Sequence, residues 1–367
     1  MIIGNGIKVL DQKHLEAKGI FFVGGKYCKE QSFINGQMFI EVYVPRKVTK
    51  RFPIIFFHGA AQTNICWLET PDGRAGWADY FLKQGYIVYL AETPARGRSA
   101  YHPSIEGEMT YFSIDDIKKF FVGNEGDWEQ AVLHTQWPDK GQNPGEEVFD
   151  QFSSSQLEYL PSNARTTQLV VDTAQELLDR TGPAILLTHS QAGPFGWVIA
   201  DRYREKVKGI IAIEPTAPCF SKNIEEAKAQ NYGIADIPLS YEPPLKSLED
   251  FKLVRMKSGL PGVRDGLVME EPARKLPNLK DLPIVIVVGE ASYHAERDYW
   301  FSYVLKQAGV DNDYVNLGEK GIHGNGHMMM LEKNSDQIAE WMNQWMIRHI
   351  KGIQLEISDD LRGMESL

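Results

Sequence analysis

One serine in the second half of the chain has the position of a nucleophile. Ser190 follows the apolar run 184–187 and precedes the helical pattern 194–203, which predicts a buried strand, a sharp turn and a helix. A hydroxyl at such a turn projects above the end of the strand, and the helix N-terminus beneath it favours negative charge. The glycines usual two residues either side are replaced by Thr188 and Ala192. A serine that only caps a helix is the alternative interpretation of this stretch.

A nucleophilic serine needs a histidine that removes its proton. His323 and His327 both lie in the glycine-rich stretch 321–327, after the last predicted strand. We prefer His327 because it directly precedes the predicted closing helix, and we expect His323 to support the loop. Their spacing also fits a helical metal pair, but the glycines argue against a helix there and no third ligand is obvious nearby. The sequence therefore predicts neither a metal nor another cofactor.

The histidine in turn needs a carboxylate that orients it. Glu214 follows the apolar residues Ile211-Ala212-Ile213 at the end of the predicted strand 207–213, and Glu290 follows the run 283–289. Asp298 is a further candidate after the second run. A glutamate at the carboxyl end of a buried strand is poorly explained by packing, and both glutamates have this property. Sequence physics leaves the choice between Glu214 and Glu290 open.

Acyl transfer also requires two backbone N–H groups that bind the developing oxyanion. The residue after the serine, Gln191, is expected to supply one of them. The other is expected from Ala60, since Gly59 allows the chain to bend tightly toward the serine. Four further side chains are predicted to line a substrate pocket: Trp67, Trp128, Phe195 and His323.

The elements that must position these residues follow from the apolar pattern. Runs that are apolar throughout indicate strands covered on both faces, as in a parallel sheet between helix layers. Residues 18–45 alternate instead, which predicts two antiparallel strands with a turn at Gly24-Gly25. Helices are predicted at 76–84, 163–180, 299–307 and 328–350. We therefore expect an α/β fold with two antiparallel and about six parallel strands.

Two long segments interrupt this alternation. Residues 100–160 have many aromatic residues and no clean period, which predicts a cap over the site. Residues 216–281 are polar and proline-rich, and either extend this cap or form a surface insertion. The expected core therefore comprises 1–99, 161–215 and 282–350, and 351–367 form a C-terminal tail.

Composition limits the partners and the location that we expect. The net charge is −10 and no long basic run is present, which argues against nucleic acid and anionic membranes as partners. The three cysteines are widely spaced, which indicates neither a disulfide framework nor a zinc site. Residues 1–18 contain no continuous apolar stretch and no transmembrane run is visible, so we expect a cytoplasmic protein, with a trimmed secreted form as the alternative.

Several motifs together resemble one branch of the α/β-hydrolases, the bacterial esterase 713-type proteins. They are His58-Gly59, Thr70-Pro71-Asp72-Gly73-Arg74, Gly97-Arg98-Ser99, His189-Ser190-Gln191, and His323-Gly324-Asn325 with His327-Met328-Met329-Met330. The order and spacing fit from about residue 36 onward. In that branch the acid follows strand six within a V/I-E-P sequence, which Ile213-Glu214-Pro215 matches.

The resemblance implies Ser190 as nucleophile, His327 as base and Glu214 as acid. It also implies Gln191 and Ala60 as oxyanion donors, and a homodimer is plausible by analogy. Paired cysteines of the branch are replaced here by Ala60-Ala61. Asp72 and Arg74 are expected to form a structural ion pair.

The sequence as a whole predicts a serine esterase that cleaves a small ester or lactone of apolar or aromatic character. Two other functions remain open. The same residues can cleave a C–C bond or a macrolactone, and a noncatalytic binding protein on a hydrolase scaffold is the alternative from another class.

Overall fold

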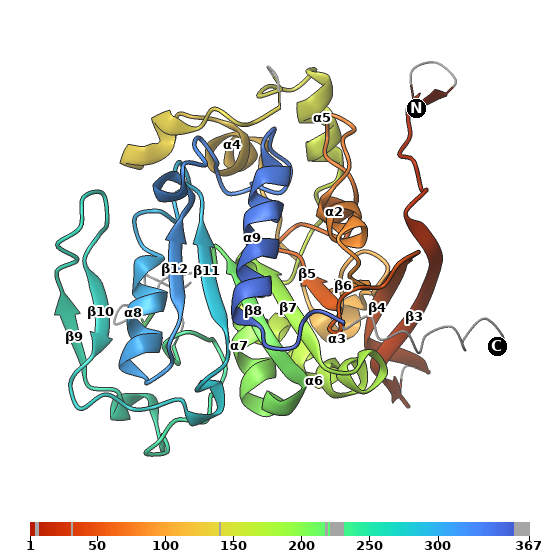
Figure 1. The fold of residues 1–367 in the computed structure, drawn as a ribbon. Coiled ribbons are helices and arrows are strands. Elements are labelled where there is room, and N and C mark those ends of the chain that lie inside the picture. Colours follow the sequence, from red (N-terminus) through yellow and green to blue (C-terminus); the bar gives the residue numbers. More distant parts are fainter. Residues whose placement is uncertain (4–6, 31, 139–140, 217–218, 221–230, 356–367) are drawn as a thin grey trace.

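The runs that are apolar throughout form the centre of one sheet. The computed structural model describes residues 1–367 except 4–6, 31, 139–140, 217–218, 221–230 and 356–367. Within the described residues, eight strands form this sheet in the order β12-β11-β8-β7-β5-β6-β4-β3 (Figure 1). Their bounds are β3 Leu15–Cys28, β4 Phe33–Pro45, β5 Ile54–Phe57, β6 Val88–Glu92, β7 Ala184–His189, β8 Val207–Ile213, β11 Ile284–Val288 and β12 Asp313–Asn316.

The strand directions agree with the sequence. The six strands from β12 to β6 pair in parallel, whereas β4 is antiparallel to both β6 and β3. All side chains of β5, β7 and β11 are buried, as expected for strands covered on both faces. The predicted α/β-hydrolase fold, with two antiparallel and six parallel strands, is confirmed.

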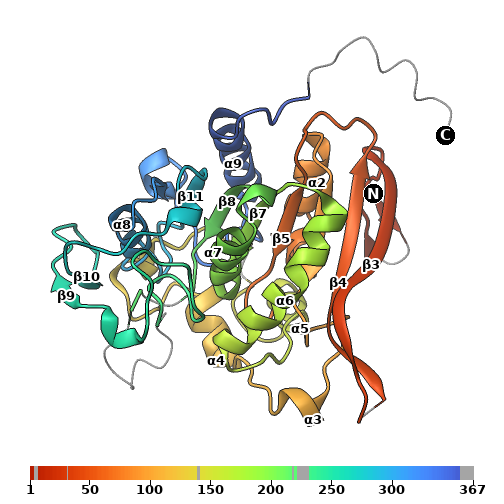
Figure 2. The ribbon, with the colours of Figure 1, turned by 90° about the horizontal axis from the view of Figure 1, so that it is seen from below.

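Two layers of helices cover the sheet (Figure 2). Buried side chains of α6 (Asn163–Thr181), α7 (Gly193–Arg202) and α8 (Tyr299–Gln307) share one core cluster with one face of the sheet. Those of α2 (Trp77–Lys83) and α9 (Ser335–His349) belong to a second cluster on the other face. Because helices cover both faces, the parallel strands have fixed positions. The polar residues of the candidate site lie just beyond the carboxyl ends of these strands.

Two expectations about the elements are wrong. Gly24 and Gly25 do not form a turn but lie within β3 with φ of 67° and 83°. A Cβ at Gly24 would lie 2.6 Å from Thr173 Cγ2 of α6, so the glycines let β3 approach that helix closely. The chain reverses after Cys28 instead, where the N–H of Ser32 donates to the Cys28 carbonyl (2.8 Å).

The closing helix is also shorter than predicted, because α9 begins only at Ser335. The guanidinium of Arg74 donates to the carbonyls of Leu331, Glu332 and Lys333 at 3.0 to 3.4 Å. These are carbonyls that a longer helix would use for its own hydrogen bonds. Residues 328–334 therefore remain a turn segment between His327 and the helix.

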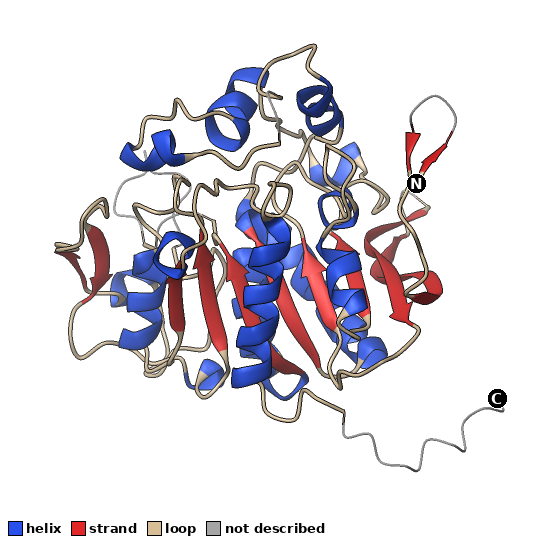
Figure 3. Cartoon of the chain, turned by 45° about the horizontal axis from the view of Figure 1, so that its top comes forward, coloured by secondary structure: helices blue, strands red, loops and turns tan. Residues whose placement is uncertain are grey.

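The first inserted segment lies above the ends of the strands in Figure 3. It contains the helices α3 Pro103–Glu106, α4 Ile114–Ile117 and α5 Glu147–Ser154. Backbone hydrogen bonds join it to two loops of the core, from Leu157 N–H to the Ala61 carbonyl (2.9 Å) and from Thr135 N–H to the Gly324 carbonyl (3.0 Å). These contacts support the predicted cap position.

The second inserted segment packs mainly beside the core. Its hairpin of β9 (Leu253–Met256) and β10 (Gly266–Met269) lies against α8. A hydrogen bond from Gln130 Nε2 to the Gly262 carbonyl (2.9 Å) joins it to the first segment. The remaining described α-helix and strands are short: α1 Ile65–Leu68, and the N-terminal strands β1 Ile2–Ile3 and β2 Ile7–Lys8.

Candidate active site

Ser190 lies at the predicted sharp turn between a strand and a helix. It follows β7 directly, begins a 3-10 turn that ends at Ala192, and α7 starts at Gly193. Its φ is 51°, a left-handed conformation that a residue with a side chain adopts only under constraint from its surroundings. The side chain is partly exposed. The strand, turn and helix predicted from the sequence are therefore confirmed.

Glycines elsewhere provide the space that Thr188 and Ala192 do not leave. A Cβ at Gly193 would lie 2.5 Å from Pro215 Cβ, so this position tolerates no side chain. A Cβ at Gly196 of α7 would lie 3.2 Å from Ile210 Cγ2 of β8, which is a tight contact, and 3.4 Å from Thr188 Cγ2. Thus α7 approaches the neighbouring chain segments closely at Gly193 and Gly196, and not at the position of Ala192.

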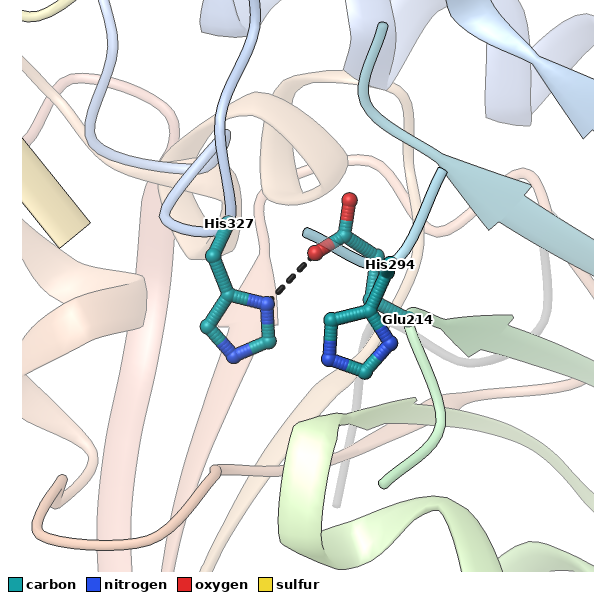
Figure 4. A group of neighbouring side chains, drawn as sticks. All are labelled: Glu214, His294 and His327. Atoms are coloured by element: carbon teal, nitrogen blue, oxygen red, sulfur yellow. Dashed lines mark hydrogen bonds and ion pairs between the residues drawn. The ribbon is translucent and has the colours of Figure 1, made fainter. Parts of the chain in front are cut away.

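Glu214 and His327 form a buried pair (Figure 4). His327 Nδ1 lies 2.5 Å from Glu214 Oε2, and the side chains are 2% and 0% exposed. The N–H of Gly289 donates to Oε1 and the hydroxyl of Ser292 donates to Oε2, both at 2.7 Å. Glu214 directly follows β8, the neighbour of β7, and has a φ of 44°. Three donors thus surround this carboxylate.

The alternative acid and the alternative histidine pair with each other. His323 Nδ1 lies 3.0 Å from Glu290 Oε1, and the N–H of Gly324 donates to Oε2 (2.9 Å). The His323 side chain is 65% exposed, so this pair lies at the surface. Among the hydrogen bonds of the described residues, none joins Glu290 to His327. The structure thus separates two carboxylate–imidazole pairs, Glu214 with His327 and Glu290 with His323.

His189 brings the serine and the buried pair together. Its Nε2–H donates to the His327 carbonyl (3.0 Å), and the two ring centroids lie 4.6 Å apart. Ser190 is the next residue, and its carbonyl accepts from the N–H of Thr216, two residues after Glu214 (3.0 Å). Within the described residues, no direct hydrogen bond joins the Ser190 hydroxyl to His327. Such bonds are often formed only when a substrate is bound.

Burial controls the charges of the pair. Desolvation, reinforced by the positive charge of Arg297, lowers the pKa of His327, so the imidazole is neutral and able to accept a proton. Burial raises the pKa of Glu214, whereas the Gly289 N–H and the Ser292 hydroxyl oppose this shift. A carboxylate beside a neutral imidazole stabilises the charge that appears when the imidazole is protonated.

The loop that contains Ala60 lies directly against the serine. A Cβ at Gly59 would lie 3.0 Å from Ser190 Cβ, so glycine is needed for this approach. The buried Arg96 joins both segments: its Nη1 donates to the carbonyls of Gly59 (3.4 Å) and Gln62 (3.2 Å), and its Nη2 donates to Gln191 Oε1 (3.3 Å). One guanidinium therefore links the two segments expected to bind an oxyanion.

The Asp72–Arg74 ion pair predicted from the sequence is present. Arg74 Nε lies 2.7 Å from Asp72 Oδ2, and Nη2 lies 3.0 Å from Oδ1. Because Arg74 also binds the carbonyls of residues 331–333, the pair holds the segment that follows His327. The contact between Arg74 and these carbonyls thus joins the motif at 70–74 to the motif that contains His327.

The predicted pocket residues occupy different environments. Trp67 and Phe195 are 0% exposed and pack in the two core clusters, so the structure places them in the core and not along a pocket. His323 is at the surface. Trp128 lies close to the site, where it contacts Tyr293 with ring centroids 5.7 Å apart.

Sequence analysis missed the segment after β11. Ser292, Tyr293 and His294 lie there and all approach the buried pair: Tyr293 and His294 have ring centroids 5.0 and 4.8 Å from that of His327. Their positions just beyond a parallel strand, at the same edge of the sheet as Glu214, were the available signal.

One group of described residues has the composition of a metal site. Glu214, His294 and His327 each place a ligand atom within 4.8 Å of the others (Figure 4). The two imidazoles stack with an angle of 4°, so their in-plane lone pairs do not converge on one point. Both nitrogens of His294 already have partners, Asp298 and Arg297. The geometry therefore favours a hydrogen-bonded cluster over a metal centre.

Comparisons with known proteins point to ester hydrolysis. No family model matches the chain. The chain is similar to the probable secreted lipase phiG of a fungal species (strain ATCC 74256), with 41% identity over 334 residues that cover 90% of each protein. It also resembles the atomic-resolution structure of a bacterial esterase, with a TM-score of 0.60 and 22% identity, over 94% of this chain and 99% of the esterase. The esterase shares the fold.

The predicted cytoplasmic location is wrong. A relative with 41% identity over 90% of this chain is a probable secreted lipase, and this finding contradicts the prediction. The prediction rested on the composition of residues 1–18 and on the lack of an apolar transmembrane run, whereas the similarity to the lipase extends over most of the chain. Of the helices that the structure describes, none is long and apolar enough to cross a membrane.

Proposed function

The chain belongs to the α/β-hydrolase superfamily and is a carboxylic ester hydrolase, and we propose that it cleaves its ester with Ser190, His327 and Glu214. The observation that carries this assignment is the buried 2.5 Å contact between Glu214 and His327, at the end of the strand next to that of Ser190. Glu290 lies instead in a surface pair with His323. The contacts thus support Glu214 over Glu290 as the acid.

The reaction follows from the roles of these groups. The Ser190 hydroxyl attacks the ester carbonyl while His327 Nε2 accepts its proton. Glu214 stabilises the resulting imidazolium, and the N–H groups of Ala60 and Gln191 bind the oxyanion. His327 then returns the proton to the departing alcohol, which leaves an acyl group on Ser190. Water, activated by His327, releases the acid and restores the serine.

The substrate that we propose is an ester or lactone of apolar or aromatic character. A relative that is a probable secreted lipase supports an apolar substrate, and the aromatic side chains of the first inserted segment lie beside the proposed base. No metal or cofactor has a role in this reaction scheme, and no partner beyond the small-molecule substrate is required. A homodimer remains a prediction from the family resemblance.

A pair of variants tests the acid. We expect Glu214→Gln to lower kcat on a nitrophenyl ester by about 10⁴-fold, the loss typical when a triad acid no longer orients its histidine. Glu290→Gln is the matched control, because it removes the same charge from the end of the adjacent strand, and should change kcat less than about threefold. The opposite result would show that Glu290 is the acid.

A fluorophosphonate probe tests the nucleophile independently. We expect a stoichiometric adduct on Ser190, identified by peptide mass spectrometry, and none in Ser190→Ala. Folded protein without an adduct at Ser190 would contradict the hydrolase mechanism and favour the noncatalytic alternative.

A further inference from the structure

Aromatic rings from two segments surround the imidazole of His327. Phe121 stacks on it with ring centroids 5.7 Å apart, and Tyr293 approaches to 5.0 Å. Tyr293 also makes edge-to-face contacts with Phe120 (5.3 Å) and Trp128 (5.7 Å). Phe120, Trp128 and Tyr293 are called the aromatic cluster below. The cluster is formed jointly by the first inserted segment and the loop after β11.

The cluster is fixed in position but still accessible. The indole N–H of Trp128 donates to the Ala291 carbonyl (2.8 Å), and Trp128 is 8% exposed. Phe120 lies nearly parallel to it, at an angle of 7°. Phe120 and Tyr293 are both partly exposed. Ring surface is therefore available to a ligand directly beside the proposed base.

Charges around the cluster define the ligand that fits. The Lys119 ammonium lies 5.4 Å from the centre of the Phe120 ring, and the Arg297 guanidinium lies 5.1 Å from that of Tyr293. Two of the three rings therefore already have a cation at one face, and a positively charged ligand would be repelled. A neutral aromatic group can instead make the edge-to-face contacts that the rings make with one another.

The direction of proton transfer assigns the cluster to one half of the substrate. The base returns its proton to the departing oxygen, so the alcohol half of the ester must lie beside His327. The acyl half remains attached to Ser190, next to the loop of Ala60. We propose that the aromatic cluster is a subsite for the alcohol half and that it selects esters of neutral aromatic alcohols. This proposal rests on the mechanism proposed above.

Benzyl and hexyl esters of one acid provide the test, because their alcohols have similar acidity and similar intrinsic reactivity. The ratio of kcat/KM for benzyl acetate over hexyl acetate measures the preference of the subsite. We expect the wild-type enzyme to favour the benzyl ester, and Phe120→Leu and Trp128→Leu each to lower the ratio by roughly 2- to 10-fold, the range of aromatic pair contacts. The exposed Tyr111→Leu, in the same inserted segment, is the control and should leave the ratio unchanged.

A second series separates this subsite from the acyl side. Hexyl acetate, butyrate and hexanoate should keep their relative kcat/KM values in both leucine variants. The proposal is overturned if the benzyl preference is absent, if both variants retain it, or if they change the acyl series instead. When Ser190 reacts with the fluorophosphonate but no benzyl preference exists, only the subsite fails. When Ser190 does not react and no ester is cleaved, the mechanism itself fails.

Discussion

Arg96 offers a sharp test of how the site is held together. Its side chain is buried, and its three hydrogen bonds join the carbonyls of Gly59 and Gln62 to the side chain of Gln191. Burial lowers its pKa to about 10, which still leaves it charged at neutral pH. Arg96→Met keeps much of the apolar volume of the side chain and removes all three donors. We expect losses of both stability and catalysis.

The magnitude follows from the contacts. Hydrogen bonds to charged groups contribute about 1.5–3 kcal/mol at good geometry, and these three are long, so about 1 kcal/mol for each is reasonable. Removal of a buried cation also removes its desolvation cost, which offsets part of the loss. We therefore expect the free energy of unfolding to fall by about 2 kcal/mol. One oxyanion donor is worth roughly 10²–10³ in kcat, so partial displacement of Ala60 should lower kcat by roughly 10- to 100-fold.

Arg98→Met is the matched control. Arg98 lies two residues further along the same loop but pairs with Glu41 (2.9 Å) and Glu92 (2.7 Å), away from the serine. It should lose stability and keep kcat within about threefold. Urea unfolding and steady-state kinetics on one ester measure both quantities for each variant. The reasoning is refuted if a folded Arg96→Met enzyme keeps its kcat, or if both variants lose kcat equally.

Two further predictions concern neighbouring contacts. Gly193→Ala places a Cβ against Pro215, which displaces the segment next to the proposed acid. We expect kcat to fall at least tenfold with little change in KM. An unchanged kcat in the variant would contradict this expectation. His134 Nε2 lies 2.7 Å from Glu332 Oε1. Burial lowers the pKa of His134, but the Glu332 carboxylate raises it, and the net result is a pKa above the usual 6.5. The ion pair therefore stabilises the fold at low pH, and this stabilisation is lost as the pH rises through the raised pKa. His134→Gln should therefore lower Tm more at pH 6 than at pH 9, and an equal loss at both values would argue against the ion pair.

Sequence patterns predicted the fold where burial alone decides it. The runs 54–57, 184–187 and 284–288 are apolar throughout and form buried strands, because no polar side chain in them favours exposure to solvent. The patterns failed where a residue distant in the sequence determines the local backbone conformation. The pair Gly24-Gly25 is typical of a turn, yet Gly24 lies within a strand that packs closely against α6. Met328 continues a helical pattern, yet the distant Arg74 binds the backbone that follows it.

The candidate site also contains residues that local patterns predict and residues that depend on distant contacts. Ser190 was identified from the local pattern of strand, turn and helix. Glu214 and Glu290 are equivalent by that criterion, since each follows a buried strand. What separates them is the conformation of the loop at 321–327, which the buried Glu332 holds through Gly326 N–H (2.9 Å). No local signal in the sequence reveals such a contact, and only the resemblance to a known branch favoured Glu214.

The short path between the proposed nucleophile and the proposed acid has a consequence for how this enzyme can change. Between Ser190 and Glu214 the chain forms only the 3-10 turn, α7, a second short turn and β8, and both inserted segments lie outside this path. The spacing of serine and carboxylate is set by two hydrogen-bonded neighbouring strands. Insertions and deletions within 100–160, or within 216–281 beyond Thr216, therefore leave the register of these two strands unchanged, and with it the separation of Ser190 and Glu214.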